Sequence, residues 1–331
     1  MIGWLLWIGK PVLLPIIAAL IVVYVLSVAA DSMTRIPVLR RLPGWARRAL
    51  ILGTFTAAVA LLFVFVINNV AQVVTAISRY ETNLDALITR LASFFEIEGE
   101  QTWENVRRVT FDQVSLRSFV APALLSLQSF GATLFLVVLY SSFFMAERGI
   151  LARKLVIAMG GADAGERALS LLNRINHRIG SYLFVKTLVN LMLGAVSFGI
   201  MVLLSIEFAL VWAILIAILN YIPFLGSLLG VILPVLLSLA QFGSLWITGM
   251  VLLSLTAAQV VVGAFLEPRM MGRAFNLSPF VVLLSLAFWS ALWGLPGALL
   301  AVPMTASLVL VLAEIDATRP IAVMLSSNGQ V

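Results

Sequence analysis

Four stretches of this chain run for eighteen or more residues without a charged side chain: 49–68, 119–146, 187–206 and 244–266. An apolar stretch of that length matches the hydrocarbon core of a bilayer, where a helix satisfies its own backbone hydrogen bonds. The composition agrees, because 62% of the residues are hydrophobic and 11% are charged, against about a half and a quarter in soluble domains. The sequence therefore predicts an all-α polytopic membrane protein with about seven to eight membrane segments.

The basic residues gather in short intervals between apolar segments, within 31–48, 147–181 and 267–279. Loops rich in Lys and Arg stay in the cytoplasm, so these intervals predict the orientation of the chain. This distribution accounts for the net charge of +6, and we expect the lipid bilayer, not nucleic acid, as the partner. Residues 1–30 form either one long span or a short interfacial helix followed by a span. Signal cleavage after Val28, Ala29 and Ala30 would export the first basic interval, so we interpret this segment as retained.

Residues 69–118 are predicted to lie outside the bilayer because they contain seven acidic residues. Apolar side chains recur at alternating spacings of three and four from Val70 to Phe94, which is the pattern of an amphipathic helix. Two roles fit this helix. It lies on the membrane domain of its own chain, or it associates with another helix through its apolar seam.

These features divide the chain into six regions. They are 1–68, with the first spans and a basic loop; 69–118, the extramembrane helical segment; 119–182, a span and a cytoplasmic segment; 183–240 and 245–313, two units that each contain a broken helix; and 314–331, the tail. Within the cytoplasmic segment, the string GGADAGE at 160–166 predicts a turn, and 168–179 predicts a polar helix.

Each of the two C-terminal units contains an interruption in an apolar block. The string NYIPFLGS separates 208–219 from 227–240, and WGLPG at 293–297 separates 279–294 from 297–313. The arms of the first break reach only about 18–20 Å at 1.5 Å per residue, short of the roughly 30 Å core. We therefore predict two broken or re-entrant helical hairpins whose tips lie inside the membrane. The alternative is a tight turn between tilted helices at the membrane surface.

The two interrupted units resemble each other. Gly297 follows Gly226 by 71 positions, and the strings GSLLGVILP and GALLAVP begin at these glycines. The first unit starts in the cytoplasm and the second starts outside, so a duplication would give an inverted repeat. Interrupted helices within inverted repeats are an architecture of secondary transporters.

A break of this kind exposes backbone and side-chain polar groups to a solute. We therefore predict a transport path for a small polar solute along the breaks and the neighbouring amides. The predicted path residues are Asn190, Asn220, Tyr221, Pro223, Gly226, Ser227, Gln259, Trp293, Gly294, Pro296 and Gly297.

Four charged residues near the membrane are candidates for gating: Lys186, Glu267, Arg269 and Arg273. Glu267 pairs with one of the two arginines as a structural clamp, or it gates a pathway. Lys186 either snorkels to the interface or faces the bundle and meets Glu267 or a solute. Glu207 is expected at the outer surface as an anchor. No acid lies deep in a span, which argues against a tightly coupled proton antiporter.

The sequence contains no sign of an enzyme. No glycine-rich phosphate loop ending in Lys-Ser/Thr is present. One histidine and no cysteine exclude ordinary zinc sites. We predict no metal, no cofactor and no catalytic residues.

Four strings are similar to the autoinducer-2 exporter (AI-2E) family of bacterial inner-membrane permeases. They are RINHRIGSYLFVKTLVN (174–190), FALVWAILIAILNYIPFLGS (208–227), LEPRMMGR (266–273) and LSPFVVLLSLAFWSALWGLPGALLAVPMT (277–305). The resemblance covers nearly the whole chain, although the family usually has more apolar sequence before the first span. It implies a transporter without ATP hydrolysis that forms a homo-oligomer, with a pentamer as one form. Within the family, export of the quorum-sensing signal autoinducer-2 is assigned to some members and Na⁺/H⁺ antiport to others.

Three functions follow as hypotheses. The first is a secondary permease that exports a small polar solute, and the second is cation/proton antiport through Glu267 and Lys186. The third is a membrane scaffold without transport activity, in which the helix within 69–118 recruits partners.

Overall fold

The structure, a computed structural model, describes residues 2–33, 41–94, 116–158, 162–271 and 277–329. These residues are almost entirely helical and include no strand. Six helices are long and apolar enough to cross a membrane, or up to seven if a bent pair counts as one span. The predicted all-α polytopic fold is confirmed.

The N-terminal half contains the helices α1 (Ile2–Ile8), α2 (Lys10–Ser32), α4 (Gly44–Phe94) and α6 (Leu116–Ala158). Only Gly9 separates α1 from α2, so the described residues from 2 to 32 form a short helix followed by a candidate span, in the order of one of the two predicted arrangements. α6 bends by 53° between 131–147 and 149–158. The span predicted at 119–146 therefore continues into the segment assigned to the cytoplasm.

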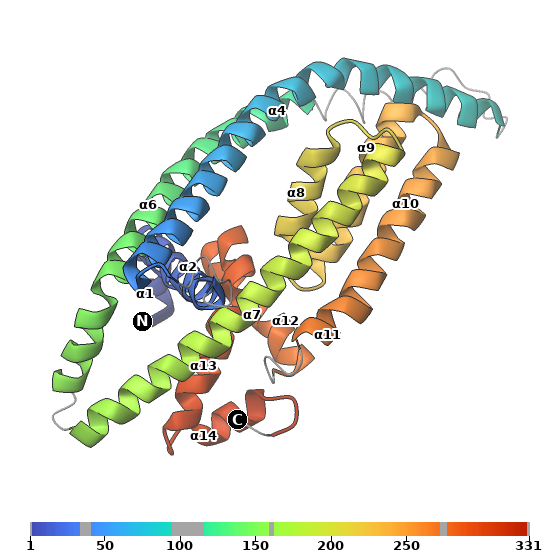
Figure 1. Cartoon of the computed structure of the whole chain (residues 1–331). Coiled ribbons are helices and arrows are strands. Elements are labelled where there is room, and N and C mark those ends of the chain that lie inside the picture. The colour runs from blue at the N-terminus through green and yellow to red at the C-terminus, as the bar shows by residue number, and fades with distance from the viewer. Residues whose placement is uncertain (1, 34–40, 95–115, 159–161, 272–276, 330–331) are drawn as a thin grey trace.

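The helix α4 corrects the predicted separation of a span at 49–68 from a helix that begins at 69. Its 51 residues form one rod of about 77 Å, which Figure 1 shows arching over the other helices. The change from apolar to charged residues at 69 does not end the helix, because no proline occurs in α4 and both kinds of residue are compatible with helix.

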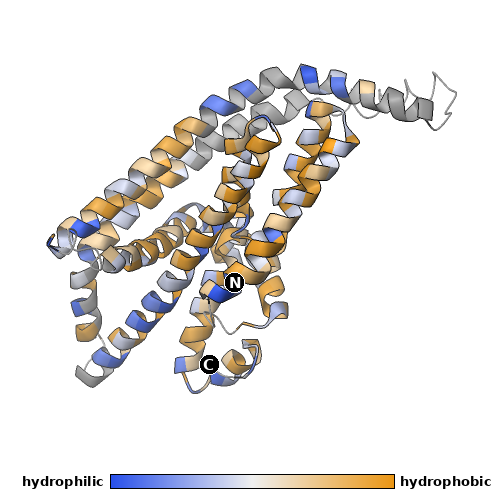
Figure 2. Ribbon diagram, turned by 45° about the vertical axis from the view of Figure 1, so that its right-hand side comes forward, coloured by the Kyte–Doolittle hydropathy of each residue, from blue (hydrophilic) through white to orange (hydrophobic). Residues whose placement is uncertain are grey.

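The helix α7 (Ala162–Leu203) corrects a second predicted boundary. The turn predicted at 160–166 is wrong for 162–166, which are helical, while 160 and 161 lie outside the described residues. The polar helix and the span predicted after it form one helix of 42 residues. Figure 2 shows hydrophilic residues along the first half of α7 and apolar residues along most of the bundle.

The two predicted breaks are present, and each separates a short helix from a long one. The first hairpin consists of α8 (Ala209–Leu219) and α9 (Leu225–Phe242), with 11 and 18 residues. The second consists of α12 (Pro279–Trp293) and α13 (Leu295–Glu314), with 15 and 20 residues. The prediction that both arms of the first break are short is wrong for α9, which is a candidate span. The long helix of the second hairpin, α13, is a candidate span as well. Both helices continue through an internal proline, Pro234 in α9 and Pro303 in α13.

The remaining C-terminal helices connect and follow these hairpins. α10 (Leu245–Val260) continues into the π-helix η3 (Val261–Leu266) and then into α11 (Glu267–Met271). The last helix of the described residues is α14 (Arg319–Leu325), and an isolated bridge joins Leu277 to Ser326.

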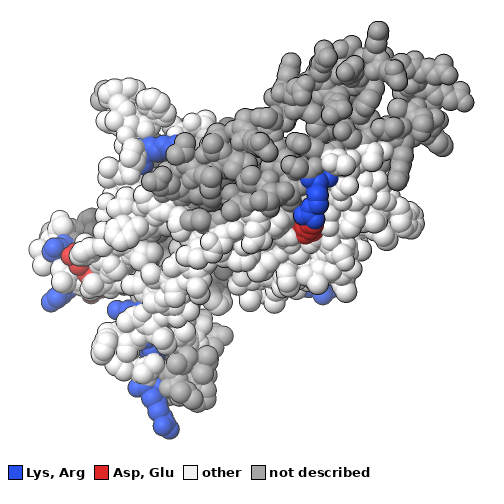
Figure 3. Space-filling view, turned by 90° about the horizontal axis from the view of Figure 1, so that it is seen from above, with Lys and Arg blue, Asp and Glu red and all other residues white. Residues whose placement is uncertain are grey.

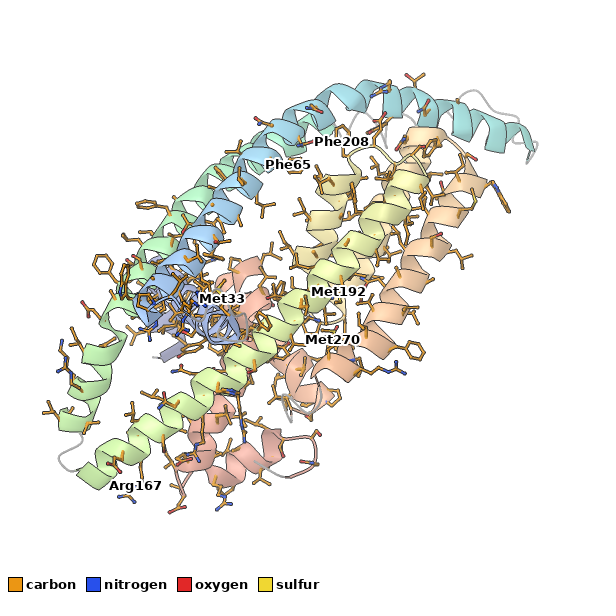
Figure 4. The ribbon with its side chains drawn as sticks, viewed as in Figure 1. Met33, Phe65, Arg167, Met192, Phe208 and Met270 are labelled. Carbon is orange, nitrogen blue, oxygen red and sulfur yellow. The ribbon has the colours of Figure 1, made fainter. Side chains whose placement is uncertain are left out.

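The two hairpins enter the bundle from opposite ends of α7. At the base of the first, the Gln241 side-chain amide donates to the carbonyl of Ser205 at 2.8 Å, just beyond the end of α7. At the base of the second, Glu314 forms an ion pair with Arg174 at 2.8 Å, in the first third of α7. Figure 4 shows the corresponding separation of Phe208 from Arg167. We name the end of α7 at the base of the first hairpin the Glu207 end, and the end at the base of the second hairpin the Arg174 end. Entry of the two hairpins from opposite ends is what an inverted repeat requires. The duplication itself stays a prediction.

Both hairpins have a glycine at the turn that packs directly against a backbone carbonyl of the short helix. A Cβ on Gly226 would collide with the carbonyl of Leu219, and a Cβ on Gly297 with the carbonyl of Trp289. Each glycine thus lets the long helix start directly against the end of the short one. The turns also contain unusual backbone, with Phe224 at φ 62° and Gly294 at φ 68°.

Candidate functional site

The tip of the first hairpin is bonded to α7 by a pair of amides. The side-chain amide of Asn220, the residue after α8, donates to the side-chain oxygen of Asn190 at 2.8 Å. Asn190 is only 2% exposed, and its own amide nitrogen has no partner among the described residues. A buried donor without a partner costs free energy, so Asn190 has a hydrogen bond available for a ligand.

Small residues bring α7 and α8 close enough for this amide bond. A Cβ on Gly194 would lie 3.1 Å from the carbonyl of Ala213 and 3.2 Å from the Cβ of Ala217. Small residues at such positions allow close packing of membrane helices. Asn190 lies one turn before Gly194, which brings it level with the end of α8.

The next residue of the tip makes a second bond to α7. The hydroxyl groups of Tyr221 and Thr187 are 2.6 Å apart. Within the described chain, no hydrogen bond reaches the carbonyl oxygens of Asn220 and Tyr221, because the turn removes their helical partners. The tip therefore combines an unpaired donor, two hydroxyls and free carbonyl acceptors.

An ion pair lies directly beside this tip. The Lys186 ammonium is 2.5 Å from a carboxylate oxygen of Glu267, and their side chains are 9% and 23% exposed. Lys186 precedes Thr187 on α7, and Glu267 is the first residue after η3. Of the alternatives left open by the sequence, Lys186 faces the bundle and meets Glu267. The paired charges cancel, so the adjoining tip presents little net charge to a solute.

The tip lies well along α7 from the Glu207 end. Asn190 precedes the last residue of α7, Leu203, by 13 residues, which is about 20 Å. The hydrocarbon core is roughly 30 Å thick. The re-entrant hairpin with its tip inside the membrane stays a prediction, as does the alternative of a turn at a membrane surface.

The predicted path residues of the first break lie together, with differences in exposure. Pro223 and Gly226 shape the turn, while Ser227 is exposed and its hydroxyl donates to the carbonyl of Phe224. Gln259 on α10 reaches the same turn, with its amide nitrogen 3.4 Å from the carbonyl of Ser227.

The predicted residues of the second break form the turn of the other hairpin. Trp293 is fully buried, and its indole nitrogen donates to the carbonyl of Leu6 in α1 at 3.1 Å. Gly294, Pro296 and Gly297 form the turn beside it. Ile222 of the first tip packs in a cluster with Leu286, Ala298 and Ala301 of the second hairpin. Ala298 directly follows Gly297, so the first tip contacts the second hairpin next to its turn.

Of the two arginines proposed for gating, Arg269 is not brought to this site. Arg269 is exposed on α11 and has no ion pair within the described residues. Arg273 lies outside the described residues. The predicted clamp between Glu267 and Arg269 is therefore wrong, because Glu267 turns toward α7.

Sequence reasoning missed Thr187, although it stands between two predicted site residues on one helix. It also missed a clamp at the Glu207 end. There Glu207 forms an ion pair with Arg79 at 3.1 Å and accepts a hydrogen bond from the Tyr80 hydroxyl at 2.7 Å. Burial, and then the bond to Glu207, raises the pKa of Tyr80 above its usual value.

A further bond completes this clamp, from the side-chain amide of Asn83 to the carbonyl of Gln241 at 2.6 Å. The described part of α4 thus lies on the membrane domain of its own chain, as one of the two roles predicted. The second role, self-association, stays a prediction. Among the described residues of this face, Figure 3 shows a few basic and acidic side chains on a surface that is otherwise uncharged.

Comparison with known proteins agrees with the architecture. The chain matches the model of the AI-2E family transporter over residues 1–317. It is 29% identical to a Haemophilus influenzae protein named "Putative transport protein", over 95% of this chain and 90% of that protein. It is 27% identical to the AI-2 transport protein TqsA of Escherichia coli K12, over 95% and 89% of the two chains. A Borreliella burgdorferi "Putative transport protein" is 33% identical over 63% and 58%. The chain therefore belongs to the AI-2E family of transporters.

Proposed function

We propose that this transporter is a secondary permease that exports a small, uncharged polar solute across the bacterial inner membrane. The solute binds at the tip of the first hairpin, between Asn190 and the turn that begins at Asn220. The single observation that carries the proposal is the buried amide nitrogen of Asn190, which has no partner among the described residues. It lies beside the tip of the first hairpin.

The groups at the tip suit a solute that carries hydroxyl or carbonyl groups. Asn190 donates, and the carbonyls of Asn220 and Tyr221 accept. The neighbouring Lys186 and Glu267 neutralise each other, so a charged solute finds no unpaired counter-ion there. The name of the Escherichia coli relative makes AI-2 the first solute to assay.

The arrangement of the hairpins supports alternating exposure of this site. They enter from opposite ends of α7, and the first tip contacts the second hairpin through Ile222. A movement of one hairpin against the other would open the tip to one side at a time.

The test is solute flux in proteoliposomes with matched variants. Asn190→Leu and Asn220→Leu keep the side-chain size but remove the hydrogen bonds at the tip. Asn68→Leu makes the same change at an exposed position of α4 and is the control. We expect flux to fall at least tenfold in the first two variants and to stay unchanged in the control. Equal flux in all three folded variants would refute the site.

Cation/proton antiport is the second candidate, and the buried ion pair favours it. Sodium that bound the Glu267 carboxylate in place of Lys186 would let the displaced ammonium release its proton to water. On the other side, Lys186 would take up a proton, bind Glu267 again and release the sodium. In proteoliposomes with an imposed pH gradient, addition of Na⁺ would then dissipate the gradient, and Glu267→Gln would abolish this effect. Solute flux without any cation-dependent change of pH would contradict antiport and support the permease.

A further inference from the structure

The helix that contains Glu267 carries one extra residue just before it. The backbone N–H of Glu267 bonds to the carbonyl of Val262, five residues back, where an α-helix would use Gly263. This π-helical turn, η3, lies between α10 and α11 in an otherwise continuous helix from Leu245 to Met271. Such turns are rare and occur frequently at functional sites.

The local sequence explains why the turn widens here. Pro268 has no N–H, and its ring would press against the carbonyl of Ala264 in a regular α-helix. A wider turn relieves that contact. Gly263 lies within the turn, and a Cβ built on it would meet nothing within 4 Å. No packing against Gly263 therefore holds the turn in its π form.

The extra residue decides which way Glu267 faces. In an α-helix each residue advances about 100° and 1.5 Å. If η3 became α-helical with the same number of residues, Glu267 would turn by about 100° around the axis. That rotation displaces the end of a side chain by about 8 Å on a helix 10–12 Å wide. A carboxylate 2.5 Å from Lys186 would no longer reach it.

We propose that η3 positions Glu267 against Lys186 and is the joint at which this ion pair opens during transport. Conversion of η3 into α-helix rotates Glu267 away from α7. Lys186 then loses its counter-ion, one residue from the Thr187–Tyr221 bond that attaches the hairpin tip to α7. Pro268 is the positioning residue, and the one extra residue within η3, whatever its side chain, sets the rotation of Glu267. Only the link to solute movement rests on the proposed function, since the opening of the joint is observable without a solute.

The test measures the joint directly. The chain has no cysteine, so spin labels can be attached to cysteines placed at Leu252 on α10 and Arg269 on α11, both exposed. The distance between the labels distinguishes the two rotations of α11. Glu267→Gln removes the ion pair, and we expect it to add a second distance, or to increase its share, relative to the parent chain.

Two further variants, each combined with Glu267→Gln, distinguish rotation at η3 from a non-specific increase in the flexibility of the helix. Deletion of Gly263 removes the extra residue, leaves a regular helix and is expected to remove the second distance. Gly263→Ala keeps the residue count and is the matched control, with the second distance retained. In the parent background, we expect the deletion to lower solute flux at least tenfold while Gly263→Ala retains flux.

The outcomes that overturn the proposal are equally specific. If Glu267→Gln gives the same single distance as the parent chain, η3 is not a joint, whether or not the deletion variant folds. If the deletion variant transports at the parental rate, the π turn is a fixed irregularity. Failure of the proposed function would instead appear as absent solute flux in the parent chain, with the label distances still responding to Glu267→Gln.

Discussion

Removal of one partner of the Lys186–Glu267 pair should destabilise the protein far more than removal of both. At 2.5 Å two unit charges attract by about 7 kcal/mol with an effective dielectric constant of about 20. Desolvation of the two groups offsets most of that attraction. Lys186→Met or Glu267→Gln alone leaves one uncompensated charge, which costs about 3–5 kcal/mol at a buried site. Since Glu267 is 23% exposed, we expect about 3 kcal/mol.

The double variant Lys186→Met/Glu267→Gln should recover most of this loss, because no unpaired charge remains. The assay is the midpoint of thermal unfolding in detergent, where 3 kcal/mol corresponds to roughly 5–10 °C. The exposed pair Arg174–Glu314, with side chains 56% and 44% exposed, provides the matched control. Its single variants should cost less than about 1 kcal/mol. If the two buried-site losses simply add in the double variant, the groups do not act as a buried pair.

Two further predictions concern the turn glycines and the clamp. Gly226→Ala and Gly297→Ala should each destabilise by about 1–3 kcal/mol, since a Cβ would collide with a backbone carbonyl; Gly249→Ala, where the space is open, should stabilise by about 0.5–1 kcal/mol. Unfolding midpoints that shift in the same direction for all three would contradict the hairpin geometry. Tyr80→Phe should cost about 1.5 kcal/mol through the lost bond to Glu207. The pKa of Tyr80 is raised above 10.0 in the folded chain. The contribution of the Tyr80 hydroxyl to stability is therefore complete below pH 10.0 and is lost as the pH rises above that value. The difference in unfolding midpoint between Tyr80→Phe and the parent chain should shrink above pH 10.0.

Hydropathy predicted where the apolar helices lie, and helix-breaking residues predicted both breaks to within a few residues. Proline and glycine act locally, so NYIPFLGS and WGLPG predict interruptions without knowledge of the neighbours. The same logic failed where no breaker occurs. The charge change at 69 marks where α4 leaves the apolar region, and a helix of good formers continues through it.

Contacts across the bundle were harder to predict, because they depend on the rotation of one helix against another. Asn190 and Asn220 are 30 residues apart, and the close approach at Gly194 brings them together. The pairing of Glu267 with Lys186 depends on η3. A sequence pattern based on 3.6 residues per turn assigns Glu267 a different face from the one it occupies. Pro268 was the available signal for that irregularity.

The proposed binding site requires the tip of the first hairpin to lie inside the lipid layer. The direct measurement is the depth of a spin label at Leu225, the first residue of α9 and 46% exposed, from its collisions with oxygen and with a water-soluble nickel chelate. Reference labels at Trp246, near the Glu207 end, and at Arg319, outside the spans, calibrate the scale. We predict that Leu225 collides with oxygen far more than Arg319 does and lies deeper than Trp246. Nickel collisions at Leu225 as frequent as those at Arg319 would place the tip at the aqueous boundary and remove the proposed site.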